Sequence, residues 1–226
     1  MNQLIGKWLP NASQIPEEFI AATVQTIYMV IWTTVIAGIL GILLGLILVF
    51  IGPGGIKSKP IIYGILDKII NTIRSIPFII LLTLLGVVTR FLVGTTIGEK
   101  AALVPLIIGV IPFYARQIEN ALLEVDPGVI EAAESMGTSP LGILFRVYLV
   151  EGLPGIIRVS AVTVINIIGF TAMAGAVGAG GLGNLAVTRG YNRFQTDVTI
   201  VATLLILVLV FFSQWVSNII IKKVSH

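Results

Sequence analysis

Charged residues are absent from five long stretches of the chain, and apolar side chains dominate each of them. These stretches are residues 19–56, 75–89, 101–115, 159–188 and 198–221. The last one contains sixteen Val, Ile, Leu or Phe residues. Burying them in lipid favours insertion by up to about 5–10 kcal/mol, whereas one central lysine would cost about 3 kcal/mol. Because a membrane-spanning helix needs about 20 such residues, the pattern predicts helices that cross a bilayer.

We predict five transmembrane helices, with boundaries read from these stretches and their flanks. They cover residues 20–50, 62–93, 101–120, 157–177 and 197–221. The first is longer than a bilayer requires and is expected to tilt or project. The second begins with Asp67, Lys68 and Arg74, so its first turns are expected at the interface or inside the protein. A six-helix alternative would split the first stretch near Gly41 and Gly45.

The composition supports an all-α polytopic membrane protein, with a single transmembrane domain over residues 1–226. Hydrophobic residues make up 56% and charged residues 11%, and the mean hydropathy is +1.03. Soluble domains carry about 25% charged residues, so soluble enzymes, nucleic-acid-binding proteins and disordered chains are excluded. The absence of cysteine excludes disulfides and thiolate metal sites. The single histidine, His226, lies beyond the last predicted helix, which argues against a histidine proton relay.

The net charge of +3 indicates an orientation rather than an affinity for nucleic acid, because cytoplasmic loops carry more Lys and Arg. One side of the predicted bundle holds seven such residues: Lys57, Lys59, Arg116, Arg146, Arg158, Lys222 and Lys223. The other side holds five: Lys7, Arg90, Lys100, Arg189 and Arg193. We therefore expect the N-terminus outside and the C-terminus inside. Residues 1–18 lack the apolar core of a cleavable signal peptide, so the first helix is expected to remain as an anchor.

The segment 121–156 is the only long charged stretch between predicted spans, and we expect it on the cytoplasmic side. Asp126 and Pro127 are suited to begin a short helix, and Gly137 is suited to end it in a left-handed conformation. Ser139 and Pro140 begin a second helix by the same logic. The predicted hairpin presents small and apolar residues, which is typical of a surface that another protein covers. These residues are Val129, Ile130, Ala132, Ala133 and Met136.

The sequence Glu131-Ala132-Ala133, followed after three residues by Gly137, resembles the EAA loop in permease subunits of ABC importers. The resemblance implies that this helix docks on an ATP-hydrolysing subunit. The implied coupling residues are Glu131, Ala132, Ala133, Met136, Gly137 and Pro140. The family continues, nine residues after the glycine, with Ile-x-Leu-Pro. This chain departs from that pattern, since residues 147–150 read VYLV and a Leu-Pro pair follows at 153–154. The bend into the fourth span is therefore not fixed by the family pattern.

Two further stretches resemble the permeases of methionine importers, and the resemblance covers nearly the whole chain from about residue 20. Residues 74–82, RSIPFIILL, resemble their second-span signature, and residues 175–183, GAVGAGGLG, resemble the glycine-rich segment after their fourth span. Shorter matches are at residues 112–113, 119–124 and 170–173. A similar glycine-rich end occurs in permeases for quaternary amines and phosphonates. A related importer for another small solute, a polar amino acid included, therefore stays an alternative.

The glycine-rich segment 175–190 predicts close backbone packing and non-helical turns. Irregular backbone at membrane depth is tolerated only when it is buried in protein or lines a cavity, so this segment is a candidate for the outer mouth of a path. A flexible external loop is the alternative. The candidate pathway and gate residues are Asn166, Met173, Gly175, Gly178, Gly180 and Gly181. Helix packing is the alternative for Asn166 and for Met173, which could also face lipid. Arg74 is a candidate conformational contact or a residue that snorkels to the interface.

By resemblance, two copies of the chain form ten helices around a central path in the cytoplasmic membrane of a prokaryote. Two ATPase subunits, which bind ATP and Mg²⁺, lie beneath, and an extracytoplasmic substrate-binding protein or lipoprotein lies above. The sequence contains no catalytic, metal or phosphate-binding motif, so we expect a non-catalytic subunit without a cofactor of its own. An ion-coupled secondary transporter is disfavoured, because these transporters normally use acidic residues within the membrane and the charge-free stretches contain none. A membrane scaffold that recruits an ATPase is a further alternative.

Overall fold

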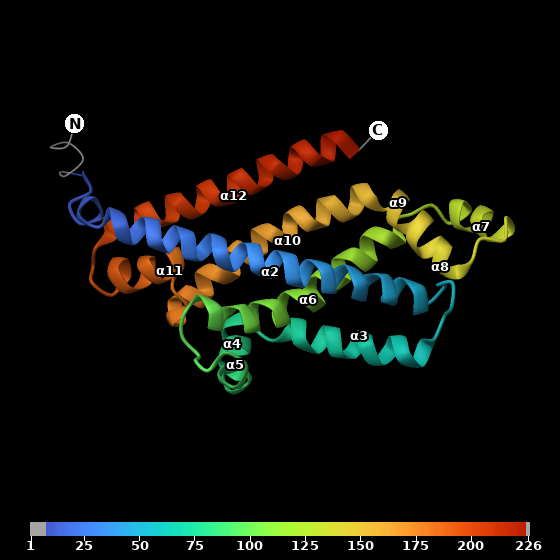
Figure 1. Cartoon of the computed structure of the whole chain (residues 1–226), viewed down its shortest axis with the longest axis horizontal. Coiled ribbons are helices and arrows are strands. Elements are labelled where there is room, and N and C mark those ends of the chain that lie inside the picture. Colours follow the sequence, from blue (N-terminus) through green and yellow to red (C-terminus); the bar gives the residue numbers. More distant parts are fainter. Residues whose placement is uncertain (1–7, 225–226) are drawn as a thin grey trace. The chain divides into compact units, whose positions relative to one another are not determined.

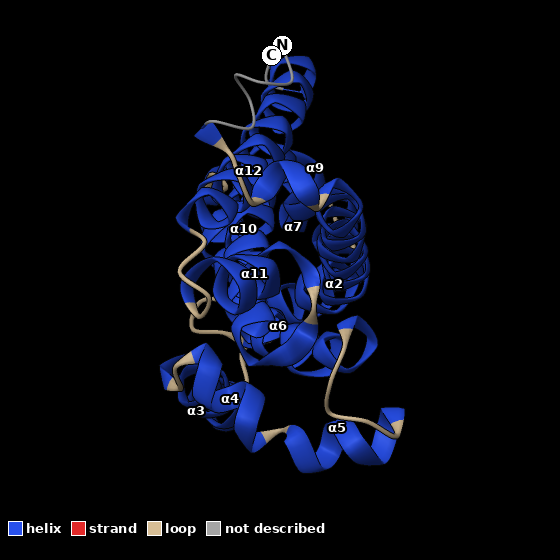
Figure 2. Cartoon of the chain, turned by 90° about the vertical axis from the view of Figure 1, so that its left-hand side faces the viewer, coloured by secondary structure: helices blue, strands red, loops and turns tan. Residues whose placement is uncertain are grey.

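The computed structural model describes residues 8–224, so the expectations for Lys7 and His226 concern residues outside this range. Within the described part of the chain, every regular element is a helix (Figures 1 and 2). Four helices there are long and apolar enough to cross a membrane. They are α2 (Pro16–Ile51), α6 (Glu99–Leu123), α10 (Leu153–Ala174, continued by η3, Gly175–Ala179) and α12 (Thr196–Val224). These helices correspond to the first, third, fourth and fifth predicted spans.

The prediction of one continuous second span over residues 62–93 is wrong. This segment forms three helices: α3 (Pro60–Ser75), α4 (Phe78–Leu84) and α5 (Gly86–Val93). The first break follows from Pro77, because the residue before a proline is pushed out of the helical region. Ile76 accordingly has extended dihedral angles, φ −80° and ψ 123°. The second break is a turn at Leu85, where ψ is 0°. No proline accounts for this second break.

Helix α2 is continuous, so the six-helix alternative that divides the first stretch is not observed. Gly41 and Gly45 instead allow α2 to approach α6. A Cβ atom at Gly41 would lie 2.6 Å from Cδ1 of Tyr114, and one at Gly45 would lie 2.6 Å from Cγ2 of Ile118. Small residues spaced four apart let two helices pack closely in a membrane. These glycines therefore contribute to helix packing rather than to a turn.

The chain divides into two compact units, each built from three segments. The first unit contains residues up to 35, 77–107 and 164–214, and the second contains 36–76, 108–163 and the residues from 215 onward. In the first unit, one core cluster surrounds Leu182 and Val198 and another surrounds Met29 and Leu106. In the second unit, a core cluster surrounds Leu48, Ile70 and Ala115.

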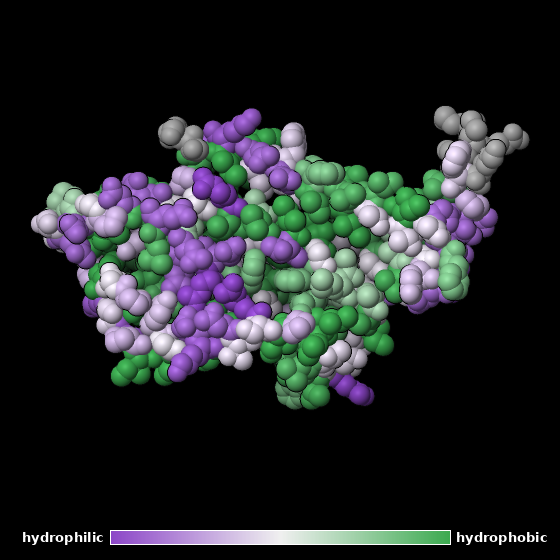
Figure 3. Space-filling view, turned by 180° about the vertical axis from the view of Figure 1, so that it is seen from behind, coloured by the Kyte–Doolittle hydropathy of each residue, from purple (hydrophilic) through white to green (hydrophobic). Residues whose placement is uncertain are grey.

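Short helices occupy most of the segments between the long ones. They are η1 (Ala12–Gln14), α7 (Pro127–Ser135), α8 (Pro140–Ile143), η2 (Leu144–Tyr148), α9 (Leu149–Glu151), α11 (Gly181–Leu185) and η4 (Ala186–Tyr191). Apolar side chains cover much of the face seen in Figure 3, where they appear green, and many large apolar residues of the described chain are exposed. Such a surface is expected of helices that face lipid or other subunits rather than water.

Candidate functional site: the EAA hairpin and the glycine-rich segment

The EAA hairpin, residues 126–143, begins as the sequence predicts. The side chain of Asp126 accepts a hydrogen bond of 2.8 Å from the N–H of Gly128, and Pro127 is the first residue of α7. In the second helix of the hairpin, Oγ of Ser139 accepts a hydrogen bond of 3.1 Å from the N–H of Gly142, and α8 begins at Pro140. These bonds use N–H groups that have no partner within their own helices. Both predicted helix starts are therefore confirmed.

Gly137 ends α7 in a left-handed conformation, with φ at +76°. Its N–H donates to the carbonyl of Glu134 (2.9 Å), and the N–H of Thr138 donates to the carbonyl of Ala133 (3.1 Å). This pair of bonds is the Schellman arrangement, which satisfies the last carbonyl groups of a helix. The predicted helix end at Gly137 is confirmed. The conformation at this residue sets the direction in which the chain enters α8.

Helix α7 is exposed along most of its length, with the exception of Ala133 and, in part, Ile130, which corrects one prediction. Val129, Ala132 and Met136 recur at helical spacing and are exposed, Met136 at 78%. Ile130 is half-buried and Ala133 is only 5% exposed. The prediction that Ala133 is presented on the surface is therefore wrong in this chain, because α7 packs against α8 and η2.

The remaining predicted coupling residues lie around this exposed face. Glu131 is exposed on α7, and Pro140 is half-buried at the start of α8. Ile143, at the end of the hairpin, and Leu144 and Tyr148, just after it, are buried, and α7 packs against α8 and η2, which contain these residues. Burial raises the pKa of the Tyr148 phenol above its usual value, and the nearby Glu134 carboxylate raises it further. Tyr148 therefore stays neutral at physiological pH.

The segment that departs from the family pattern, residues 147–150, lies in η2 and α9. Helix α10 begins two residues after α9, at Leu153, so that Pro154 falls in its first turn. Proline is tolerated there, because the first N–H groups of a helix need no partner within it. The displaced Leu-Pro pair thus begins the fourth span. Gly152 precedes it and leaves space for Leu122, since a Cβ atom would lie 2.7 Å from Cδ2 of that leucine.

The glycine-rich segment consists of short helices with non-helical turns between them, and it is closely packed. Gly178, Gly180 and Gly181 have φ angles of +96°, +81° and +77°. Gly175 and Gly183 bring parts of the segment into close contact, since a Cβ atom on either would overlap backbone atoms, those of Asn184 and Ala172 respectively. The predicted non-helical turns and close packing are confirmed. A plain flexible loop does not describe this segment.

Two residues of α2 that the sequence analysis missed hold the start of α11. Oε1 of Gln25 accepts a hydrogen bond of 2.8 Å from the N–H of Gly181, and Oγ1 of Thr26 accepts one of 2.9 Å from the N–H of Leu182. They cap α11 from another part of the chain, as a local N-cap residue would. Gln25 and Thr26 are polar residues in a 38-residue stretch without charge, which could have marked them as residues with a structural role. The sequence did not indicate that their partners lie 156 positions away.

The other two pathway candidates lie on α10, which leads directly into the glycine-rich segment. Asn166 and Met173 are seven residues apart on α10, which places them on one face of that helix. Met173 is 51% exposed and Asn166 is half-buried. Gly175 and Gly181 are buried, and Gly178 and Gly180 are half-buried. Asn166 and Met173 therefore share one side of α10, which is exposed at Met173 and half-buried at Asn166, and the four glycines belong to the closely packed segment that follows.

A cluster of charged and polar side chains joins α3 to α6, and the sequence analysis missed it. Arg116 forms ion pairs with Asp67 and with Glu119, the latter at 2.6 Å. The hydroxyl of Tyr63 donates a hydrogen bond of 2.9 Å to Glu119. Asp67 was expected at the interface or inside the protein, and its ion pair agrees with this expectation. Arg74, the candidate conformational contact, is exposed on α3.

The chain resembles proteins of known family along almost its entire length. The family described as binding-protein-dependent transport system inner membrane component matches residues 37–226. The probable D-methionine transport system permease protein MetI of Vibrio cholerae is 40% identical over 222 residues, which cover 98% of this chain and 97% of that protein. The methionine import system permease protein MetP of Bacillus subtilis is 45% identical over 217 residues, which cover 96% and 97%.

Solved structures agree with this assignment. A structure of the MetNI methionine ABC transporter in inward-facing conformations has a TM-score of 0.92 and 38% identity, and the match covers 94% of this chain and 99% of that one. An amino acid ABC transporter with 18% identity and a TM-score of 0.78 shares the fold. The resemblance drawn from the EAA loop is confirmed. This chain is a multi-pass membrane protein that belongs to the binding-protein-dependent transport system inner membrane component family.

Proposed function

We propose that this chain is the permease subunit of an ATP-driven importer that moves methionine, D-methionine and related derivatives included, across the cytoplasmic membrane. One observation supports methionine as the substrate. The two relatives described above are named for methionine or D-methionine, and they are 40% and 45% identical to this chain over nearly its full length. Importers for quaternary amines or phosphonates share the glycine-rich end, but these relatives match the chain over all its helices.

The proposed assembly contains two copies of this chain, two ATPase subunits and an extracytoplasmic substrate-binding protein. The exposed face of α7, formed by Val129, Ala132 and Met136, would dock on the ATPase. A surface helix of small and apolar residues suits insertion into a groove of another protein. The distribution of Lys and Arg supports a cytoplasmic position for this helix, with the N-terminus outside and the C-terminus inside.

ATP binding would bring the two ATPase subunits together and draw the two α7 helices toward each other. This movement would turn the path between the two copies from inward-facing to outward-facing, and hydrolysis would reset it. The chain then acts as a two-state element whose equilibrium the ATPase biases. Two observations support this role: the end of α7 at Gly137 is hydrogen-bonded in a Schellman arrangement, and α7 packs against α8 and η2. A movement of α7 would be transmitted to the spans only if the hairpin keeps its shape.

The test is uptake of labelled methionine into proteoliposomes that contain the chain, its ATPase and its binding protein. We expect accumulation with ATP inside and none with a non-hydrolysable analogue. Uptake by the chain alone, driven by a proton or sodium gradient, would establish the ion-coupled alternative. ATP hydrolysis without accumulation of any solute would favour a scaffold. Uptake of another solute in preference to methionine would overturn the proposed substrate.

A further inference from the structure

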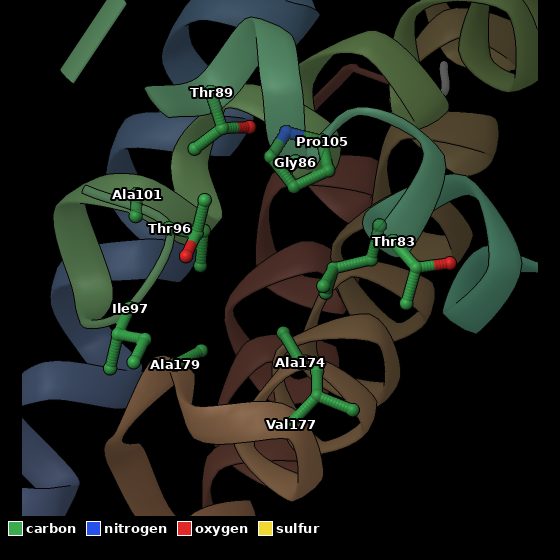
Figure 4. A pocket seen from close by; sticks show the side chains of 12 residues that line it. Thr83, Gly86, Thr89, Thr96, Ile97, Ala101, Pro105, Ala174, Val177 and Ala179 are labelled. Atoms are coloured by element: carbon green, nitrogen blue, oxygen red, sulfur yellow. The ribbon is translucent and has the colours of Figure 1, made fainter. Parts of the chain in front are cut away.

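The pocket in the first compact unit offers little to a charged solute. It has a volume of about 330 Å³ and is lined by α4, α5, the start of α6 and the end of α10 with η3 (Figure 4). Most of its lining residues are apolar, and Thr89 and Ala101 are only 3% and 1% exposed. Exposed polar side chains are concentrated instead on α3, which belongs to the second unit.

Helix α3 has two exposed sides of opposite character. Four polar residues recur at intervals of three or four positions, which places them on one side of the helix. This polar arc consists of Lys68, Asn71, Arg74 and Ser75, all exposed. Four isoleucines are exposed on another side. This apolar arc consists of Ile61, Ile62, Ile65 and Ile69. A helix with two such surfaces is expected to meet two different environments.

The third side of α3 packs on α2 and α6 and sets the depth of the polar arc. Ile70 belongs to one buried core cluster with Leu48 of α2 and Ala115 of α6. Tyr63, two turns earlier in α3, donates a hydrogen bond of 2.9 Å to Glu119, one turn later in α6, so the two helices run in opposite directions. The residues of α3 after Ile70 therefore lie beside the charge-free stretch of α6 that ends at Ala115.

Asn71 and Arg74 are poorly suited to face hydrocarbon at this depth. Among the residues that the structure describes, the Asn71 amide has no hydrogen-bond partner and Arg74 has no ion pair. Polar and charged side chains at membrane depth normally face the protein or a water-filled cavity. An arginine can also snorkel to the interface, but the Asn71 side chain is too short to do so. Asn71 therefore requires water or another polar surface beside it.

The charge of the polar arc favours water over direct contact with a second copy of the chain. Lys68 and Arg74 are both cationic, and the ion pairs of the described residues involve neither. In a symmetric dimer a face packed on its equivalent would meet the same residues. The cations of both copies would then be brought together, which is unfavourable. A layer of water between the copies would weaken this repulsion, because of its high dielectric constant.

We propose that the polar arc lines the water-filled inner half of the transport path, where Arg74 and Lys68 attract the carboxylate of the solute. The apolar arc then faces lipid. The loop before α3 carries Lys57 and Lys59, which supports a cytoplasmic position for this end of the helix. The inference rests on the proposed function and deepens it, because a cationic path favours a solute with a carboxylate and disfavours an amine without one.

Single cysteine substitutions test which arc faces water, because the chain has no cysteine of its own. The complex of permease and ATPase in nanodiscs is treated with a charged methanethiosulfonate reagent, and the mass of the permease reports its modification. Asn71→Cys and Ser75→Cys should react at least about tenfold faster than Ile69→Cys, because hydrocarbon excludes the charge of the reagent.

Ile69 is the matched control, since it is 51% exposed on the apolar arc and lies closer to the start of α3 than either polar position. A reagent that merely enters from the membrane surface would reach Ile69 first. Two polar positions are used, so that poor assembly of one variant does not decide the result. Equal rates on the two arcs, or no reaction on the polar arc, would overturn the proposal.

The charge of the path is measured by comparing an anionic with a cationic reagent. At Asn71→Cys the anionic reagent should be favoured, relative to the rates of both reagents with a small free thiol. Adding Arg74→Gln should lower this preference by about threefold, which is the effect of one charge about 6 Å away in water. Arg90→Gln, at an exposed arginine of α5, is the control and should leave the preference unchanged. The same preference with and without Arg74 would overturn the attraction of the carboxylate.

The nucleotide state shows whether this water belongs to the path. A non-hydrolysable ATP analogue, with the binding protein present, should slow the modification of Ser75→Cys, because the proposed mechanism then turns the path outward. An unchanged rate would indicate a static crevice and would overturn the assignment to the path.

Uptake into proteoliposomes separates this inference from the proposed function. If the wild-type assembly imports methionine but the polar arc does not react, the inference is wrong and the proposed function stands. If the assembly imports another solute in preference to methionine and the polar arc reacts as expected, the proposed substrate is wrong and the path along α3 stands.

Discussion

Arg116 and Glu119, one turn apart on α6, form an ion pair of 2.6 Å, and the Glu119 side chain is only 3% exposed. Removal of one member leaves a charge buried without compensation, which typically costs about 3–5 kcal/mol. Arg116→Met should therefore lower the thermal stability of the purified complex strongly. The matched control is Asp67→Asn. It removes the other, 33% exposed partner of Arg116, and should cost about 1 kcal/mol or less. Equal losses of thermal stability in the two variants would show that the buried ion pair contributes no more to stability than the more exposed one.

Substitution of Gly137 should separate ATP hydrolysis from transport. Its φ of +76° is unfavourable for a β-branched residue by about 1–2 kcal/mol, so Gly137→Val should distort the end of α7. We expect more ATP hydrolysed per methionine imported. Asparagine tolerates the left-handed region, so Gly137→Asn should behave nearly as the wild type. A coupling ratio in Gly137→Val equal to that of the wild type would contradict the proposed role of this turn.

Lysine substitutions at two positions of α7 test whether its exposed face docks on the ATPase. Ala132→Lys places a bulky charge on the proposed docking face and should abolish co-purification of the ATPase. Glu134→Lys introduces the same side chain at an exposed residue about half a turn away, and should retain the ATPase. If Ala132→Lys assembles normally, α7 docks through another face.

The contacts of α2 with the glycine-rich segment predict a local loss of stability. Thr26→Val removes the acceptor for the buried N–H of Leu182, which should cost about 1–3 kcal/mol. Hydrogen exchange in residues 180–185 should become faster. Thr23→Val is the control, because the Thr23 hydroxyl donates to a carbonyl within its own helix, that of Phe19. Equal exchange rates in both variants would exclude Thr26 as the cap of α11.

The EAA hairpin could be predicted from the sequence because its signals are local. Asp126 lies beside the N–H it caps, and the left-handed turn at Gly137 depends on the residues that immediately surround it. The resemblance to the family then assigned the hairpin a role. The exposure of Ala133 was predicted wrongly, since the EAA pattern gives residue types and not which side of α7 packs against the rest of the chain.

The contacts that sequence reasoning missed join residues far apart in the chain. Gln25 and Gly181 are 156 positions apart, and Asp67 and Arg116 are 49 apart. A single sequence shows that such side chains are polar but does not show which of them meet. The broken second span is different, because Pro77 was visible in the sequence. Hydropathy alone joined α3, α4 and α5 into one helix, although the proline marked the first break.

The close approach of Gly183 to Ala172 has a consequence for how natural variation in this protein is interpreted. On scales of size or hydropathy, Gly183→Ala is among the mildest exchanges available, but the added methyl group would overlap the backbone of Ala172. At Gly86, by contrast, an added Cβ atom would have its nearest neighbour, Cγ2 of Thr96, 4.0 Å away, which is an ordinary contact. In a deep mutational scan, the effect of an added methyl group at Gly175 and Gly183 should therefore follow the distance to the opposing main chain. Chemical similarity would be a poor guide to which substitutions are tolerated there.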